Sequence, residues 1–162
     1  MSEYIIETFA KFSDKLNEIV GYTDYLLNVY KNASESVEAH NQMSRYSENA
    51  LCNLVCDAFK EGGEVDVTII NAGTVRSDID KGNISYQEII NTMPFSNDVL
   101  VKEITGQTIL DALEFGVRSL PEPTSRFPQV SRISFKIDTS INSSVVVNKD
   151  EMFQGVNGER RF

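Results

Sequence analysis

The 162-residue sequence has little of several residue types that define common functional sites. It contains one histidine and two cysteines, too few to assemble a zinc site from the usual ligands. Its 15 lysines and arginines are outnumbered by 24 aspartates and glutamates, giving a formal net charge of −9. A phosphate backbone would be repelled by that excess, so nucleic acid is not an expected partner.

Long apolar runs are also missing. No run in the sequence approaches the length needed to cross a bilayer, so no membrane segment is expected in this chain. The first residues lack the apolar core of a signal peptide. If the parent protein is exported, its signal is expected to lie outside this chain.

The remaining composition, 41% apolar and 24% charged, is ordinary for one globular domain. Cys52 and Cys56 lie four residues apart on a predicted helix and therefore face the same way. That spacing suits a disulfide poorly, so buried free thiols are the expected state.

The stretch Val65–Asn97 organises the rest of the chain. Its apolar opening, Val65–Ile70, predicts a strand that enters the core and stops at Asn71. Gly73 lets a ligand approach the backbone because no Cβ is in the way. Arg76 follows three residues later and offers a planar set of donors suited to a carboxylate or a phosphate.

A short helix, Tyr86–Met93, comes next. Ser85 and Glu88 predict a capping box at its start, and Pro94 terminates it. Phe95 then falls in a loop. An arginine on one loop and an aromatic ring on the next indicate a site for an anionic ligand that contains a ring.

Each piece also has a simpler interpretation. Residues 71–73 can form a plain turn, Arg76 can be a solvated partner of Asp78, and Phe95 can fill a small core. The order and spacing of the whole run favour the ligand site over these separate explanations.

This run resembles the C-terminal domain of the 5'-nucleotidase family, which includes UDP-sugar hydrolases and 2',3'-cyclic-nucleotide phosphodiesterases. The family pattern contains ETNLGNLIADA, NGGGIR after a strand, a GDITYGDV-like segment, LPFGN, LTG opening a helix, and FLQVSG. The matches run in order between about Ile19 and Ser134: Glu48–Ala58, Asn71–Arg76, Gly82–Ile89, Met93–Asn97, Ile104–Gly106 and Phe127–Ser131.

The resemblance implies an α+β fold of layered mixed sheets flanked by helices. Residues 1–20 would be a linker helix from an N-terminal catalytic domain, and residues 21–162 the substrate-binding domain. The parent enzyme would hydrolyse nucleoside monophosphates to nucleoside and phosphate, using a divalent metal pair, such as zinc, held by the N-terminal domain. It would be extracellular, periplasmic or at the cell surface if it follows the family.

Within this chain the resemblance implies substrate positioning and no bond breaking. No catalytic residue, metal ligand or cofactor is expected here, since the sequence has no Asp-x-His set. The implied partners are a nucleotide or nucleoside and the protein's own N-terminal metallophosphoesterase domain. The residues implied to bind substrate are Arg45, Asn71, Gly73, Arg76, Phe95 and Asn97.

The resemblance also implies a role for each of these residues. Phe95 would stack on the base and Asn97 would hydrogen-bond its edge. Arg45, Asn71 and Arg76 would hold the ribose and the anionic part of the substrate. Taken alone, Arg45 can equally be a solvated loop arginine.

The sequence departs from the family pattern in places that leave the substrate open. Ala72 and Thr74 replace two glycines, and Thr74 adds a β-branched side chain near the expected ligand. A GGDGY-like motif, whose aromatic would close the second side of the base, has no match, so one or more final strands are expected to be missing. Weak or undetectable nucleotide binding is expected for this chain alone. The alternatives are a non-catalytic binding module of the same fold, or the domain of a UDP-sugar hydrolase or a cyclic-nucleotide phosphodiesterase.

Periodicity predicts the other elements. Helices are expected at Ile5–Val20, at Asn49–Lys60 with Ser47 as N-cap and Gly62-Gly63 as the stop, and from Thr105 to about Leu120. A long polar loop is expected at Lys31–Ser47. Strands are expected at Tyr25–Tyr30, Val99–Ile104, Ile133–Ile137 and Val145–Val147.

Overall fold

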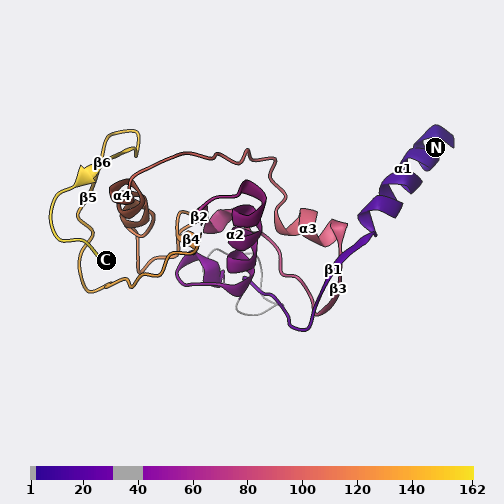
Figure 1. Ribbon diagram of the computed structural model, residues 1–162, viewed down its shortest axis with the longest axis horizontal. Helices are drawn as coiled ribbons and strands as arrows, with labels where there is room; N and C mark the ends of the chain where they lie inside the picture. The colour runs from indigo at the N-terminus through magenta and orange to yellow at the C-terminus, as the bar shows by residue number, and fades with distance from the viewer. Residues whose placement is uncertain (1–2, 31–41) are drawn as a thin grey trace.

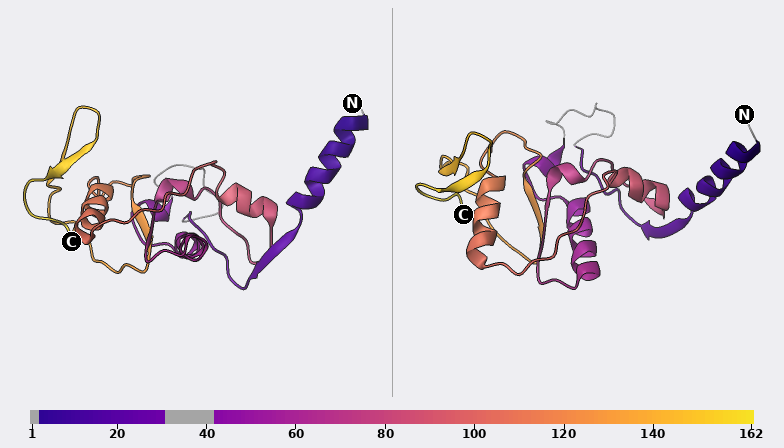
Figure 2. Two further views of the ribbon diagram at one scale, coloured as in Figure 1. Left: turned by 45° about the horizontal axis from the view of Figure 1, so that its top comes forward. Right: turned by 90° about the horizontal axis from the view of Figure 1, so that it is seen from above.

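The computed structural model describes residues 3–30 and 42–162 (Figure 1). The molecule is elongated, with α1 projecting at one end and the β5–β6 pair at the other; Figure 2 shows the same arrangement from two further sides. Between these ends, α2 packs against β2 and β4. The elements are α1 (Glu3–Leu16), β1 (Ile19–Thr23), η2 (Met43–Arg45), α2 (Ala50–Gly63), β2 (Thr68–Asn71), η3 (Ala72–Thr74), β3 (Gly82–Ser85), α3 (Tyr86–Thr92), α4 (Gly106–Gly116), β4 (Pro128–Ser131), β5 (Val145–Val147) and β6 (Phe153–Val156).

The strands of the described residues form three antiparallel pairs, β1–β3, β2–β4 and β5–β6. Helices and antiparallel strands in mixed order confirm the predicted α+β class. In the central pair, Ile70 lies opposite Gln129 and Ile69 lies opposite Val130. In an antiparallel pair, every second pair of opposed residues is joined by backbone hydrogen bonds. The Ala72 N–H donates to the Phe127 carbonyl, so the opposed residues Ile69 and Val130 form a pair without such bonds, and their backbone groups point out of the sheet edges. Both edges of this two-stranded sheet are therefore bare among the described strands.

Side-chain caps set the starts of three helices. The capping box of α3 is confirmed: Ser85 Oγ accepts from the Glu88 N–H, and Glu88 Oε2 accepts from the Ser85 N–H at 2.8 Å. Hydrogen bonds from the Ser85 backbone and side chain lower the pKa of the Glu88 carboxyl. Thr105 caps α4, as predicted, by accepting from the Thr108 N–H at 3.2 Å.

The N-cap of α2 is Asn49, so the prediction of Ser47 was wrong. Asn49 has an extended backbone, and its Oδ1 accepts from the Cys52 N–H at 3.1 Å. The helix also continues through the two predicted stop glycines. It ends only when Glu64 adopts the left-handed conformation, with φ of 51°.

The N-terminal helix is shorter than predicted, because the chain leaves α1 after Leu16 and enters β1. Ile19 and Val20 continue the helical apolar stripe but are exposed, and Gly21 pairs with Ile84 of β3. Pairing with β3 overrides the helical periodicity here. Phe12 on α1 is also exposed, so the described part of this helix is not a core helix.

Two predicted strands have no ladder. With the rest of the described chain, Tyr25–Tyr30 makes isolated bridges, Leu27 to Ile79 and Tyr30 to Gln42. Val99–Ile104 alternates in sequence, yet its apolar side chains are exposed, Leu100 to 74%. A strand needs a partner for its backbone groups, and a cleft separates this segment from β2. Residues 31–41 of the predicted polar loop lie outside the described residues.

The predicted strand Ile133–Ile137 is also wrong, although its pattern of burial is right. Alternate side chains are half-buried, with Ser134 and Lys136 exposed between them, but no described strand pairs with the segment. Arg132, with φ of 66°, turns the chain away from β2 directly after β4. Val145–Val147 is confirmed as β5, and its partner is β6, for which no strand was predicted.

The core consists of two clusters. One contains Val29, Leu51, Cys52, Val55, Val75, Ile79 and Ile84, and the other contains Ala72, Val117, Leu120 and Phe127. Both cysteines are buried and free, as predicted, and burial raises the pKa of each thiol to about 12. None of the helices in residues 3–30 and 42–162 has the length and apolar character required to traverse a bilayer.

The C-terminal residues fold back onto the end of α4. The buried Arg161 guanidinium donates to the carbonyls of Val117, at 2.8 Å, and Leu120, at 3.0 Å. Its Nε donates to the Ile141 carbonyl at 2.8 Å. Val117 is the C-cap residue of α4, so the guanidinium holds the C-terminal residues against the end of this helix.

Candidate functional site

The loop Asn71–Arg76 is held between the two core clusters. Ala72, on one side, packs with Val117, Leu120 and Phe127, while Val75 packs in the other cluster. The Ala72 N–H donates to the Phe127 carbonyl at 2.9 Å. Since the loop is buried at two points three residues apart, its exposed residues have a fixed backbone.

Asn71 and Gly73 contact the segment that precedes β4. The Asn71 side-chain amide donates to the Ser125 carbonyl at 3.1 Å, and the Gly73 N–H donates to the same carbonyl at 3.0 Å. A Cβ on Gly73 would lie 3.0 Å from both Asn71 Nδ2 and Ser125 Cβ. This glycine therefore permits a close approach within the loop, and its φ is not in the left-handed region.

Thr74, which departs from the family pattern, also bonds within the loop. Its hydroxyl donates to Asn71 Oδ1 at 3.0 Å. Asn71 thus donates to Ser125 and accepts from Thr74, which fixes the orientation of its amide. Thr74 therefore restricts the side-chain orientation of Asn71, which the resemblance implies as a contact of the ligand.

Arg76 and Phe95 are neighbours. The guanidinium carbon of Arg76 lies 6.0 Å from the centroid of the Phe95 ring. The Arg76 N–H donates to the Thr92 carbonyl at 2.8 Å, which ties the loop to the end of α3, just before Phe95. Phe95 is 52% exposed, so it does not fill a core position.

Asp78 is not the partner of Arg76 among the described residues. Its carboxylate instead accepts from the Val29 N–H at 2.7 Å, and no ion pair to Arg76 occurs in residues 3–30 and 42–162. The Tyr30 hydroxyl donates to the Arg76 carbonyl at 3.0 Å. The backbone around Arg76 is thus held on both sides while its charge is not neutralised by Asp78.

Arg45 lies at the end of η2, close to Arg76. Partial burial and, secondarily, the positive charge of Arg76 lower the pKa of Arg45, whereas Tyr30 acts in the opposite direction. Arg45 Nε donates to Gln42 Oε1 at 2.7 Å. The guanidinium groups of Arg45 and Arg76 thus make this part of the surface locally positive, although the chain as a whole is acidic.

Asn97 lies apart from the arginines, on a cleft of about 730 Å³ along the free edge of β2. Asn71 and Thr74 line the same cleft, together with the exposed apolar segment that includes Val99 and Leu100. Its described lining does not include Arg45, Arg76 or Phe95. Of the six predicted residues, Arg76 thus lies beside Phe95 and close enough to Arg45 for their charges to interact, while Asn71 and Asn97 share the cleft along β2.

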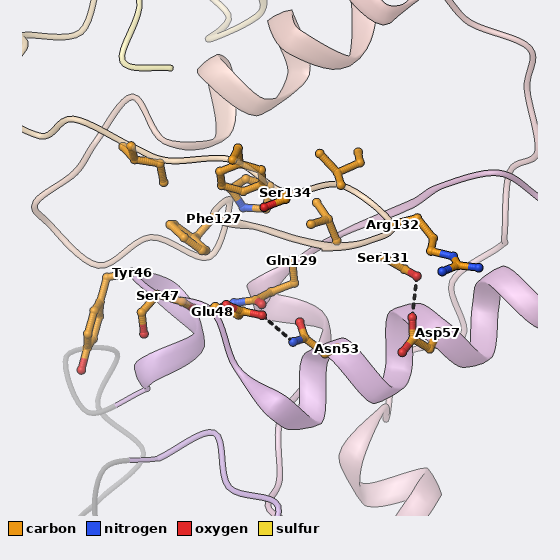
Figure 3. Close-up of a pocket in the computed structure, with 15 residues that line it drawn as sticks. Tyr46, Ser47, Glu48, Asn53, Asp57, Phe127, Gln129, Ser131, Arg132 and Ser134 are labelled. Carbon is orange, nitrogen blue, oxygen red and sulfur yellow. Dashed lines mark hydrogen bonds between the residues drawn. The ribbon is translucent and has the colours of Figure 1, made fainter.

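A second cleft, of about 390 Å³, follows the free edge of β4 and was not predicted (Figure 3). Ser131 donates to Asp57 at 2.5 Å across it, and Asn53 donates to Glu48 at 2.8 Å. Arg132 lies at the same end as Asp57 in Figure 3. The Asp57 carboxylate is thus bonded to Ser131 and the Glu48 carboxylate to Asn53. No group of three potential metal ligands occurs in the described part of the chain.

Gln42 is the contact that sequence reasoning missed. It is 1% exposed and bonds both Arg45 and the loop that carries Arg76. The only sequence signal is its position three residues before Arg45, which matters once the intervening turn is known. Ser125 and Thr92 contribute backbone carbonyls, which no residue pattern reveals.

Comparisons with known proteins show the family of the chain. A family model described as "5'-nucleotidase, C-terminal domain" matches residues 27–157. The trifunctional nucleotide phosphoesterase protein YfkN of Bacillus subtilis is 30% identical over 163 residues, covering 89% of this chain and 10% of that protein. The 5'-nucleotidase of Vibrio parahaemolyticus is 27% identical over 126 residues, covering 78% of this chain and 22% of that protein.

The crystal structure of a 5'-nucleotidase precursor from Thermus thermophilus has the same fold, with a TM-score of 0.70 and 22% identity. The match covers 96% of this chain and 30% of that one. The chain belongs to the 5'-nucleotidase family and contains its C-terminal domain. It spans less than a third of the length of each of these proteins.

Proposed function

We propose that this chain is the substrate-binding part of a 5'-nucleotidase-like phosphohydrolase that converts nucleoside monophosphates to nucleoside and phosphate. The observation that carries the proposal is that the Arg76 guanidinium carbon lies 6.0 Å from the centroid of the exposed Phe95 ring, with Arg45 close enough to Arg76 for their charges to interact. A cationic pair beside an exposed ring suits a ligand with an anionic part and a base.

Each residue has a defined task in this proposal. Phe95 offers one face to the base, and Asn97 bonds the base edge from the adjoining cleft. Arg45, Asn71 and Arg76 orient the ribose and the anionic part, with Gly73 allowing the loop to close against Ser125. None of these side chains attacks or protonates a bond.

Bond cleavage is assigned to a divalent metal pair, such as zinc, in an N-terminal metallophosphoesterase domain of the parent protein. The described residues do not fit such a centre, because no group of three His, Cys, Asp or Glu side chains gathers among them. In this proposal, residues 1–20 form a linker to that N-terminal domain. The exposed Phe12 on α1 supports this, because it leaves an apolar surface for a further partner.

The substrate can also be another phosphoester, and two observations favour testing this. YfkN is named a trifunctional nucleotide phosphoesterase, and Thr74 fills part of the loop that is glycine in the family pattern. We therefore keep a UDP-sugar or a 2',3'-cyclic nucleotide as second candidates. A non-catalytic module of the same fold would bind nucleotide without hydrolysis.

The test uses the full-length protein that carries this chain. Phosphate release is measured with AMP, UDP-glucose and 2',3'-cyclic AMP as substrates in the presence of a divalent metal. We expect AMP to have the highest kcat/KM, and the Arg76→Ala variant to raise KM for AMP more than it lowers kcat. An unchanged KM in Arg76→Ala, or absence of hydrolysis by the wild-type protein, would overturn the proposal.

A further inference from the structure

We infer that Gln42 is the positioning residue that sets the relative placement of Arg45 and the Asn71–Arg76 loop. The inference rests on the proposed function, since it explains how the cationic pair is held. Gln42 is 1% exposed and belongs to neither core cluster. Its side-chain amide is surrounded by groups of the candidate site.

The two ends of the Gln42 amide act on different elements. Its Nε2 donates to the Val75 carbonyl at 2.8 Å and to the Ala72 carbonyl at 3.3 Å. Its Oε1 accepts from Arg45 Nε at 2.7 Å. One planar group therefore joins the turn that carries Arg45 to the loop that ends in Arg76.

The hydrogen bonds of Gln42 oppose the repulsion between Arg45 and Arg76. Arg45 and Arg76 are close enough for their charges to repel, and Arg45 is partly withdrawn from water. Without a bound anion, repulsion would drive the two guanidinium groups apart. The acceptor on Gln42 holds Arg45 through Nε, so this bond does not use the two terminal nitrogens of the guanidinium.

The chemistry at residue 42 is specific. The site needs a donor toward two carbonyls and an acceptor toward a guanidinium, separated by the width of an amide. Methionine has a similar volume but supplies neither N–H donor nor strong acceptor. The Gln42→Met variant therefore removes the junction while largely keeping the packing.

The test measures steady-state kinetics with AMP in the full-length protein for Gln42→Met, Arg45→Ala and the double variant. We expect Gln42→Met to raise KM about tenfold with less than a twofold change in kcat. In the Arg45→Ala background the same substitution is expected to raise KM less than about threefold, because the positioned side chain is already gone.

A second measurement does not depend on activity. The 15N-labelled arginine side chains are observed by NMR in wild type and in Gln42→Met. We expect the Arg45 Nε–H to be protected from exchange in the wild type and to exchange rapidly in Gln42→Met. A purely structural role of Gln42 would lower stability without this loss.

Leu113→Ala is the control for loss of stability, because Leu113 is buried on α4 but lies in neither cluster that holds the loop. It is expected to leave KM unchanged. If Arg45→Ala raises KM but Gln42→Met does not, or if the two effects on KM are fully additive, the inference on Gln42 is wrong while the proposed function stands. If Arg45→Ala and Arg76→Ala both leave KM unchanged, the proposed function itself fails.

Discussion

Arg76 and Phe95 lie side by side, with the Arg76 guanidinium carbon 6.0 Å from the centroid of the Phe95 ring. The Arg76 N–H donates to the Thr92 carbonyl at 2.8 Å, which ties the loop of Arg76 to the end of the helix that precedes Phe95. Phe95 remains half exposed in this arrangement. Its ring is therefore positioned without being consumed by core packing.

Phe95→Ala is predicted to weaken substrate binding in the full-length protein. Base stacking on an aromatic ring contributes about 1–3 kcal/mol, so KM for AMP should rise roughly 5- to 150-fold, with a smaller effect on kcat. Tyr25→Ala is the matched control, since Tyr25 is another exposed aromatic residue and is assigned no role. Equal KM values for Phe95→Ala and wild type would contradict the stacking role.

Two helix-end glycines should respond in opposite directions to alanine. A Cβ on Gly116 would lie 2.9 Å from the Arg126 carbonyl oxygen, so Gly116→Ala should lower the free energy of unfolding by about 1–3 kcal/mol. Gly62 has no atom within 4 Å of the same position, so Gly62→Ala should raise it by about 0.5–1 kcal/mol. Urea denaturation measures both, and a loss of stability in Gly62→Ala would show that the two sites are not distinguished by space.

The capping box of α3 predicts a pH dependence of stability. Hydrogen bonds from Ser85 lower the pKa of Glu88, so this carboxylate stabilises the fold above its unfolded pKa, and the contribution is lost as pH falls through the folded value. Glu88→Gln keeps an acceptor for the Ser85 N–H but cannot titrate. The difference in unfolding free energy between wild type and Glu88→Gln should shrink between neutral pH and about pH 3. A difference that stays constant with pH would contradict the assignment.

The buried thiols should be chemically silent in the folded chain. Burial raises the pKa of Cys52 and Cys56 from 9.0 to about 12, so neither forms a thiolate near neutral pH. Ellman's reagent is expected to react with both thiols in urea and with neither in buffer. Rapid reaction without denaturant would show that α2 opens readily.

The raised pKa values of the two thiols also predict the direction in which stability changes at alkaline pH. A raised folded pKa favours the protonated native state, so stability is fully present below the unfolded value of 9.0 and falls as pH rises above it. The Cys52→Ala/Cys56→Ala variant should lose less stability between pH 8 and about pH 11 than wild type does. Parallel curves for the two proteins would refute the assignment.

Two adjacent arginines should differ sharply in their effect on stability. Arg161 is buried and donates to the Val117, Leu120 and Ile141 carbonyls, so Arg161→Met should cost about 2–4 kcal/mol. Arg160 pairs with Asp111 in a partly exposed ion pair, and Arg160→Met should cost about 1 kcal/mol or less. Equal losses in urea denaturation would contradict the capping role of Arg161.

Local signals predicted the parts of the fold that depend on neighbouring residues. The capping box at Ser85 and the cap at Thr105 are short-range features, and the structure confirms them. The errors arose where pairing decides the conformation. Val99–Ile104 has a strand pattern but no described partner, while Ile19 and Val20 continue a helical pattern but lie in β1, which pairs with β3.

The candidate site divides in the same way. Arg76 and Phe95 were predicted as neighbours from the order of the motifs, and the structure brings them together, although their binding role stays a prediction. Gln42 was not predicted, because its significance depends on carbonyls of Ala72 and Val75 that are distant in sequence. Side-chain bonds to backbone atoms leave no trace in residue types, so the support of a site is harder to predict than its charged groups.

In the two-stranded sheet of β2 and β4, backbone hydrogen-bonding groups face outward on both edges, at Ile69 on one edge and at Val130 on the other. An open strand edge of this kind is a template for main-chain pairing with another extended segment. In concentrated solution, separate molecules would then associate through these strand edges. A lysine introduced at either edge should prevent that association.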